Sequence, residues 1–254
     1  EQEAINILLE VLKKSKEPVE VLSFGSARIL AVAYNRAPKL MKQKIHKIHL
    51  SAGTASKNHE LGSDAGANAI PGGEWNVALD VFAFNRILKS DLPVAIYPCA
   101  GKDGGFVKDC NNTYWKLPDM DFIRKMNPQL QRYLDFAFTM NADYPVDIDL
   151  NRYPRPFHVW ESAIWLKATQ REIICTPTGE YRLVKEGKSN KGDRIVANEL
   201  RRCNLDEIRD GRFQFSYTDK SSDKEIYYRP DLDENEKALQ QVIPELYISI
   251  SPSH

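Results

Sequence analysis

The stretch that most constrains this chain is residues 66–76, a glycine-rich loop that runs directly into an amphipathic segment. The loop carries Asn68, Glu74 and Asn76, and residues 77–89 then place apolar side chains at helical spacing. A polar loop held by a rigid helix is a common form of ligand site. Because amide and carboxylate groups donate and accept hydrogen bonds, the loop predicts recognition of a polyhydroxylated ligand such as a sugar.

The charge pattern around this loop limits the kind of ligand. Lys and Arg are absent from residues 62–85, which argues against a phosphate-binding loop. A simpler interpretation also stays open, in which Asn76 only caps the following helix while the glycines form a turn. That interpretation accounts for Asn76 but gives Asn68 and Glu74 no role.

The composition excludes several classes of partner. Lys plus Arg and Asp plus Glu each number 35, so no net charge favours nucleic acid or an anionic membrane. No apolar run approaches the roughly 20 residues of a membrane-spanning helix. The four cysteines and five histidines do not form a zinc pattern, and His46 and His49 should lie on opposite faces of one strand. We therefore expect a small or neutral partner.

The order of elements predicts the fold class. Short runs of β-branched residues alternate with helical segments; we expect strands at 19–23, 45–50 and 94–97 and helices at 5–14, 27–34 and 77–89. This alternation predicts an α/β protein with a doubly wound, mostly parallel open sheet. Ligands of such sheets bind at the carboxyl ends of the strands, and the expected loops at 24–27 and 51–73 leave from that edge.

The last third of the chain has a different pattern. Short strands separated by charged turns are expected at 172–175, 181–184, 212–217 and 225–228, with a final helix at 233–241. These strands predict a small antiparallel C-terminal addition. We expect one domain over residues 1–254, made of an α/β core at 1–168 and a mixed region at 169–254.

The loop residues also carry a family resemblance. The spacing of the motif resembles the fingerprint of the inosine-uridine preferring nucleoside hydrolases, or nucleoside N-ribohydrolases, through Asn68, Pro71, Glu74, Trp75, Asn76 and Asp80. The resemblance covers residues 5–98 well and residues 152–180 more weakly. It implies a nucleoside hydrolase-like sheet and hydrolysis of the N-glycosidic bond of ribonucleosides to ribose and free base. It also implies a calcium ion that holds the ribose hydroxyls and a water molecule.

The resemblance assigns roles to the loop residues and to one backbone carbonyl. Asn68 and Glu74 would bind the 5′-hydroxyl side of the ribose, and Asn76 would bind the 3′-hydroxyl. A negative Glu74 would also favour the positive charge that develops on the ribose ring. The backbone carbonyl of Arg28 falls where the family has a calcium ligand, although its side chain adds a cation there.

A second family motif, His-Asp at the start of a helix, corresponds to residues 158–161, which read His-Val-Trp-Glu. The resemblance implies Glu161 as the metal carboxylate and His158 as a proton donor to the leaving base. Simpler interpretations stay open for both. His158 could be a packed residue between aromatic neighbours, and Glu161 could be an acid favoured in the first turn of a helix.

One departure from the family keeps three functions open. The family's N-terminal strand, with its Asp-x-Asp-x-x-x-Asp-Asp calcium cluster, has no counterpart in this chain, so we expect the first strands of the fold to be missing. The chain is then part of a calcium-dependent N-glycosidase, a non-catalytic nucleoside- or sugar-binding protein, or a structural half-domain that pairs with another chain through an open sheet edge. The expected partner is a nucleoside or ribose-like small molecule, with a homo-oligomer as one option. The sequence indicates no compartment.

Overall fold

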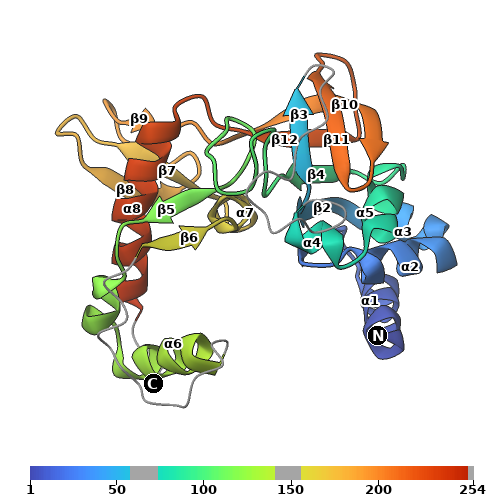
Figure 1. The fold of residues 1–254 in the computed structure, drawn as a ribbon, viewed down its shortest axis with the longest axis horizontal. Helices are drawn as coiled ribbons and strands as arrows, with labels where there is room; N and C mark the ends of the chain where they lie inside the picture. The colour runs from blue at the N-terminus through green and yellow to red at the C-terminus, as the bar shows by residue number, and fades with distance from the viewer. Residues whose placement is uncertain (58–73, 141–155, 251–254) are drawn as a thin grey trace. The chain divides into compact units, whose positions relative to one another are not determined.

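The computed structural model describes residues 1–57, 74–140 and 156–250 (Figure 1). The chain forms two compact units. The first comprises Glu1–Tyr114, Trp160–Gln170 and Ala197–Leu232, and the second comprises Trp115–Val159, Arg171–Val196 and Asp233–His254. The expected single domain over residues 1–254 stays a prediction.

The first unit is built on a sheet that has seven strands among the described residues. In spatial order its strands are β1 (Val19–Phe24), β2 (Ile45–Ser51), β4 (Val94–Tyr97), β12 (Lys224–Tyr228), β10 (Glu199–Arg209), β11 (Arg212–Tyr217) and β3 (Thr54–Lys57). Pairs β1–β2, β2–β4, β4–β12 and β11–β3 are parallel, whereas β10 is antiparallel to both of its neighbours. The predicted mostly parallel open sheet is therefore confirmed.

Helices cover both faces of this sheet, as expected for a doubly wound fold. The helices of the unit are α1 (Gln2–Lys14), α2 (Arg28–Arg36), α3 (Pro38–Lys44), α4 (Trp75–Ala78), α5 (Val81–Leu88) and α7 (Ser162–Ala168). Alternate strand residues such as Ile48 and Ile96 pack with buried side chains of α1, α2, α3 and α5 in one large core. On the other face, Tyr97 and Tyr227 pack against Ile164 of α7.

The helix predicted at residues 77–89 is divided into α4 and α5. Asp80 causes the break, because its backbone is extended and its carboxylate accepts a hydrogen bond from the Ala83 amide at 3.0 Å as the N-cap of α5. The apolar spacing is still correct, since Val77, Phe84 and Leu88 are all buried. Part of the expected loop is also ordered as β3, which pairs with β11.

In its described residues, the second unit contains two small antiparallel sheets. One pairs β5 (Trp115–Leu117) with β6 (Phe157–Val159), and the other places β7 (Arg171–Cys175) between β8 (Tyr181–Lys185) and β9 (Arg194–Ile195). Its helices are η1 (Asp121–Lys125), α6 (Pro128–Met140) and α8 (Leu232–Ser249). The predicted antiparallel addition is thus present. The inclusion of β11 and β12 in it was wrong, because both belong to the main sheet.

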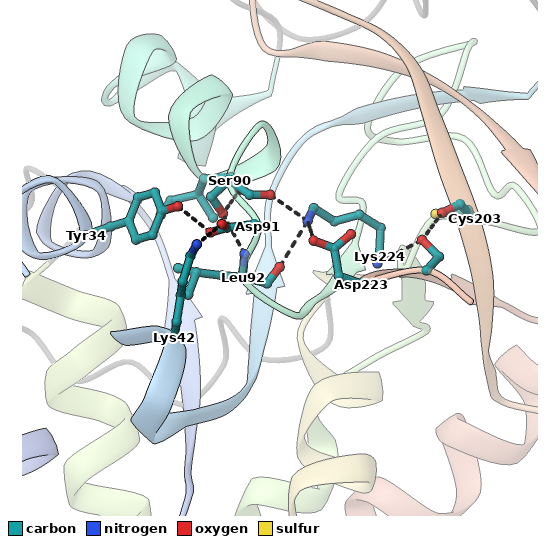
Figure 2. A network of polar contacts seen from close by, with 10 residues as sticks. Tyr34, Lys42, Ser90, Asp91, Leu92, Cys203, Asp223 and Lys224 are labelled. Atoms are coloured by element: carbon teal, nitrogen blue, oxygen red, sulfur yellow. Dashed lines mark hydrogen bonds and ion pairs between the residues drawn. The ribbon is translucent and has the colours of Figure 1, made fainter. Parts of the chain in front are cut away.

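A buried lysine fixes the turn that leads into β4. Lys224, which begins β12 and is 5% exposed, donates to the carbonyls of Ser90 at 2.9 Å and Leu92 at 3.0 Å (Figure 2). Its ammonium group also forms an ion pair with Asp223 at 2.9 Å. Because β4 and β12 are adjacent parallel strands, this contact joins their amino-terminal ends.

The same turn is tied to two helices on the core side. The Asp91 carboxylate accepts a hydrogen bond from the Tyr34 hydroxyl of α2 and forms an ion pair with Lys42 of α3 (Figure 2). These contacts lie at the end of the sheet opposite to the carboxyl ends of its parallel strands. Among the helices that the structure describes, none has both the length and the apolar character needed to cross a membrane.

Candidate functional site

The carboxyl ends of β2 and β4 bring together a compact group of polar residues. Ser51 is the last residue of β2 and is fully buried, and Cys99 follows β4. The Ser51 Oγ and Cys99 Sγ atoms lie 3.4 Å apart. Gly53 turns the chain away from β2 with a φ of 102°, and a Cβ atom there would lie 2.6 Å from the Phe84 ring. This position therefore requires glycine.

Glu74 enters this group from the start of α4. Its side chain is buried, and Oε2 accepts a hydrogen bond from the Gly53 amide at 2.9 Å while Oε1 accepts one from the Asn76 amide at 2.7 Å. Glu74 is thus the N-cap of α4. The interpretation that Asn76 caps the helix is wrong. Asn76 lies inside α4, and its Nδ2 donates to the Ser51 carbonyl at 2.8 Å.

Glu161 reaches the same group from the residue before α7. The Ser51 hydroxyl donates to Glu161 Oε1 at 3.4 Å, and the Glu161 side chain makes no capping hydrogen bond to α7. The structure therefore joins Glu74, Asn76 and Glu161 around Ser51. Within the described ranges, no Lys or Arg forms an ion pair with either carboxylate.

The electrostatics of this group follow from burial and from the two nearby carboxylates. Burial raises the pKa of Glu74, the amide hydrogen bonds from Asn76 and Gly53 lower it, and the negative charge of Glu161 raises it further. Burial also raises the pKa of the Cys99 thiol, with a further contribution from the charge of Glu74. Cys99 is therefore a protonated thiol that packs in the site, not an activated nucleophile.

Trp160 fixes the position of Glu161. Its indole Nε1 donates to the carbonyls of Cys99 at 2.9 Å and Gly105 at 3.1 Å, so the residue before Glu161 is anchored to the loop that follows β4. The rings of Phe106 and Tyr114 pack against this indole, with centroids 5.5 Å and 5.4 Å away. The indole of Trp160 therefore holds this side of the site together.

Sequence reasoning missed Ser51 and Cys99. Neither belongs to a motif, and each is a small residue at the end of a strand. The signal that could have identified them is their position, since residues at and just after the carboxyl ends of adjacent parallel strands meet at one edge of a sheet.

The remaining predicted site residues are Asn68, His158 and Arg28. Asn68 lies in residues 58–73, outside the described residues. His158 is exposed on β6 of the second unit, opposite Lys116, so its role as a proton donor stays a prediction. Arg28 begins α2, and its Nε donates to Asp80 at 2.6 Å; the role of its backbone carbonyl as a calcium ligand also stays a prediction.

The described residues do not supply a complete metal site. Across residues 1–57, 74–140 and 156–250, no three His, Cys, Asp or Glu side chains gather as metal ligands. Glu74 and Glu161 offer the hard oxygen donors that calcium prefers, but two carboxylates fill only part of its shell of six to eight oxygens. Calcium therefore stays a prediction.

The chain is similar in part to known proteins. No family model matches the chain. An uncharacterized protein of Schizosaccharomyces pombe is 23% identical over 186 residues, which cover 56% of this chain and 57% of the relative. The crystal structure of an inosine-uridine preferring nucleoside hydrolase from Bacillus anthracis has a TM-score of 0.45 and 16% identity, over 94% of this chain and 64% of that chain. The chain thus spans little more than half the length of the curated relative, and these values do not assign it to a family.

Proposed function

We propose that the group around Ser51 binds the ribose part of a nucleoside, and that the chain is part of a nucleoside hydrolase-like N-glycosidase. The observation that supports this most is the placement of Glu74, Asn76 and Glu161 together at the carboxyl ends of β2 and β4. In open α/β sheets this edge is the usual position of a ligand.

The chemistry of the group suits a ribose ring. A carboxylate has about four acceptor positions, and the backbone amides that bond to Glu74 do not fill all of them, so a ribose hydroxyl can donate to it. The side-chain oxygen of Asn76 offers a further acceptor. The specificity of such a site comes from these few polar groups, because a ligand without the hydroxyls leaves them unpaired.

The same carboxylates would favour the reaction. In N-glycosidic hydrolysis the bond from C1′ to the base nitrogen breaks, its electron pair leaves with the base, and positive charge develops on the ribose ring. Glu74 and Glu161 are negative groups near this charge. Water adds to C1′ as hydroxide, and the proton that it releases replaces the one that a general acid gives to the departing base. We propose His158 as the proton donor to the base and Asn68 as a further ribose ligand, both from the family resemblance.

A second candidate is a nucleoside- or sugar-binding protein without catalysis. It is favoured by the incomplete set of metal ligands among the described residues. When bound, calcium would supply charge stabilisation and orient the attacking water.

The test is a calorimetric titration of inosine into the chain and into the variant Glu161→Gln. Since Glu161 caps no helix, the fold should be kept while one charged hydrogen bond is lost, so the Kd should rise about tenfold or more. The matched control is Glu207→Gln, an exposed glutamate on β10, which should bind as the unchanged protein does. An equal Kd in all three proteins would contradict the proposal.

Release of free base from inosine separates the enzyme from the binding protein. We expect little or no release by this chain, because two carboxylates do not complete the calcium shell. Rapid release that a chelator abolishes would show that further metal ligands lie outside the described residues. Binding without any release in a longer form of the protein would support the non-catalytic candidate.

A further inference from the structure

A separate pocket of about 500 Å³ opens beside β10, β12 and the turn after β11. The residues that define its chemistry are Leu200, Arg201, Arg202, Tyr217, Asp219 and Glu225. Its volume lies within the range of small-molecule sites, and none of these residues belongs to the group around Ser51.

Two of its charged residues are already neutralised. The Arg201 Nε atom lies 3.0 Å from the Glu199 carboxylate, and the guanidinium carbon lies 3.5 Å from the centre of the Tyr228 ring. The Glu225 carboxylate forms an ion pair with Lys47 at 2.5 Å. These groups shape the pocket but offer no unbalanced charge to a ligand.

Arg202 and Asp219 supply the remaining charges. Arg202 Nη1 makes only a long contact of 3.5 Å to the backbone carbonyl of Asp219. In the part of the chain that the structure describes, neither this guanidinium nor the Asp219 carboxylate has an ion-pair partner. The backbone contact brings the two residues together, so the pocket presents one positive and one negative group. Leu200 and Tyr217 add apolar surface.

We infer that this pocket binds a small zwitterion of the amino-acid type. The ligand carboxylate accepts hydrogen bonds from the guanidinium fork of Arg202, and the ligand ammonium donates to Asp219. An apolar or aromatic side chain lies against Leu200 and Tyr217. A ligand that carries only a negative charge pairs with Arg202 and is repelled by Asp219. A ligand that carries only a positive charge pairs with Asp219 and is repelled by Arg202. Because both groups are accessible to water, the Kd should be on the order of millimolar.

The test uses three probes that differ in one charged group. Nuclear magnetic resonance titrations of the chain would measure the Kd of phenylalanine, of phenylpropanoate, which lacks the ammonium group, and of phenethylamine, which lacks the carboxylate. We expect phenylalanine to bind about threefold or more tightly than either of the others. In Arg202→Gln, phenylalanine should bind no more tightly than phenethylamine. In Asp219→Asn, phenylalanine should bind no more tightly than phenylpropanoate.

Arg209→Gln and Asp210→Asn are matched controls, since both residues lie at the other end of the β10–β11 hairpin and line no part of the pocket. Both should keep the preference for phenylalanine. Equal binding of the three probes, no binding at about 20 mM, or a preference that survives in Arg202→Gln and Asp219→Asn would each overturn the inference.

Discussion

At the residue scale, Glu74 both caps a helix and lies in the candidate site. Each of its carboxylate oxygens accepts a hydrogen bond from a backbone amide, so a change at this residue alters the fold and the site together. Glu161 differs, because its side chain contacts the Ser51 hydroxyl and caps nothing. Substitutions of the two glutamates can therefore distinguish an effect on stability from an effect on ligand binding.

We expect Glu74→Gln to lower the free energy of unfolding by about 1–2 kcal/mol, because the new amide NH₂ faces a backbone N–H and one acceptor is lost. Glu161→Gln should change the free energy of unfolding by less than about 0.5 kcal/mol. Urea unfolding of both variants measures these values. In Glu161→Gln the pKa of Glu74 should also fall, since the charge of Glu161 raises it. Equal destabilisation in the two variants would contradict the assignment of Glu74 as the cap.

His49 predicts a pH dependence of stability. The side chain is 4% exposed, its Nδ1 atom lies 3.1 Å from the Tyr97 hydroxyl, and Nε2 lies 3.4 Å from the Glu20 carboxylate. Burial lowers the pKa of His49 below its ordinary value of 6.5, while Glu20 raises it and Lys47 lowers it. Below that ordinary value the unfolded chain binds a proton that the folded protein does not. The free energy of unfolding therefore falls as the pH drops from 6.5 toward the folded pKa.

When the pH is lowered from about 7.5 to about 5.5, the free energy of unfolding should fall by about 1 kcal/mol more in the unchanged protein than in His49→Gln. Urea unfolding at the two pH values measures both losses. His46→Gln is the matched control, because His46 is exposed on the opposite face of the same strand. Its free energy of unfolding should fall as much as that of the unchanged protein. If His49→Gln lost as much stability as the control, His49 would not be the titrating group.

At the scale of elements, Lys224 joins the amino-terminal ends of β4 and β12. Replacement by Met leaves the carbonyls of Ser90 and Leu92 without this donor, so we expect Lys224→Met to lower the free energy of unfolding by about 2–4 kcal/mol. The exposed Lys220→Met is the control in urea unfolding. Since Lys224 lies at the opposite end of the strands from Ser51, inosine binding should not change under native conditions. A loss of binding by the folded variant would contradict this separation.

The elements also show what the sequence could predict. The strands expected at 19–23, 45–50 and 94–97 are present as β1, β2 and β4, because β-branched runs between helices leave few alternatives. The break at Asp80 was missed because apolar spacing continues through it, from Val77 to Leu88. The strands that pair with β11 and β12 were also not predicted. The alternation of apolar residues in a strand indicates which side chains are buried, but it does not identify the neighbouring strand.

The candidate site was predictable where a motif existed. The motif identified Glu74 and Asn76, and the family resemblance identified Glu161, which the structure places with them. Ser51 and Cys99 had no such signal, because their contribution comes from the meeting of two strand ends that are distant in sequence. The hydrogen bond from the Gly53 amide to Glu74 could likewise not be predicted from the sequence, because it depends on the turn at Gly53.

At the scale of the whole molecule, the chain is an α/β protein with a mostly parallel sheet in one unit and small antiparallel sheets in another. The candidate site lies within the first unit, built from the ends of β2 and β4 and the starts of α4 and α7. Ribose binding should therefore depend on this unit.

The central claim is that Glu74, Asn76 and Glu161 together recognise ribose hydroxyls. The most direct measurement is a calorimetric titration of a ribose-like iminosugar, and of the same compound without its ring hydroxyls, into the unchanged protein. The hydroxylated compound should bind about tenfold or more tightly, since each polar group of the site would otherwise lose a partner. Equal affinity for the two compounds, or no binding of either, would contradict the claim.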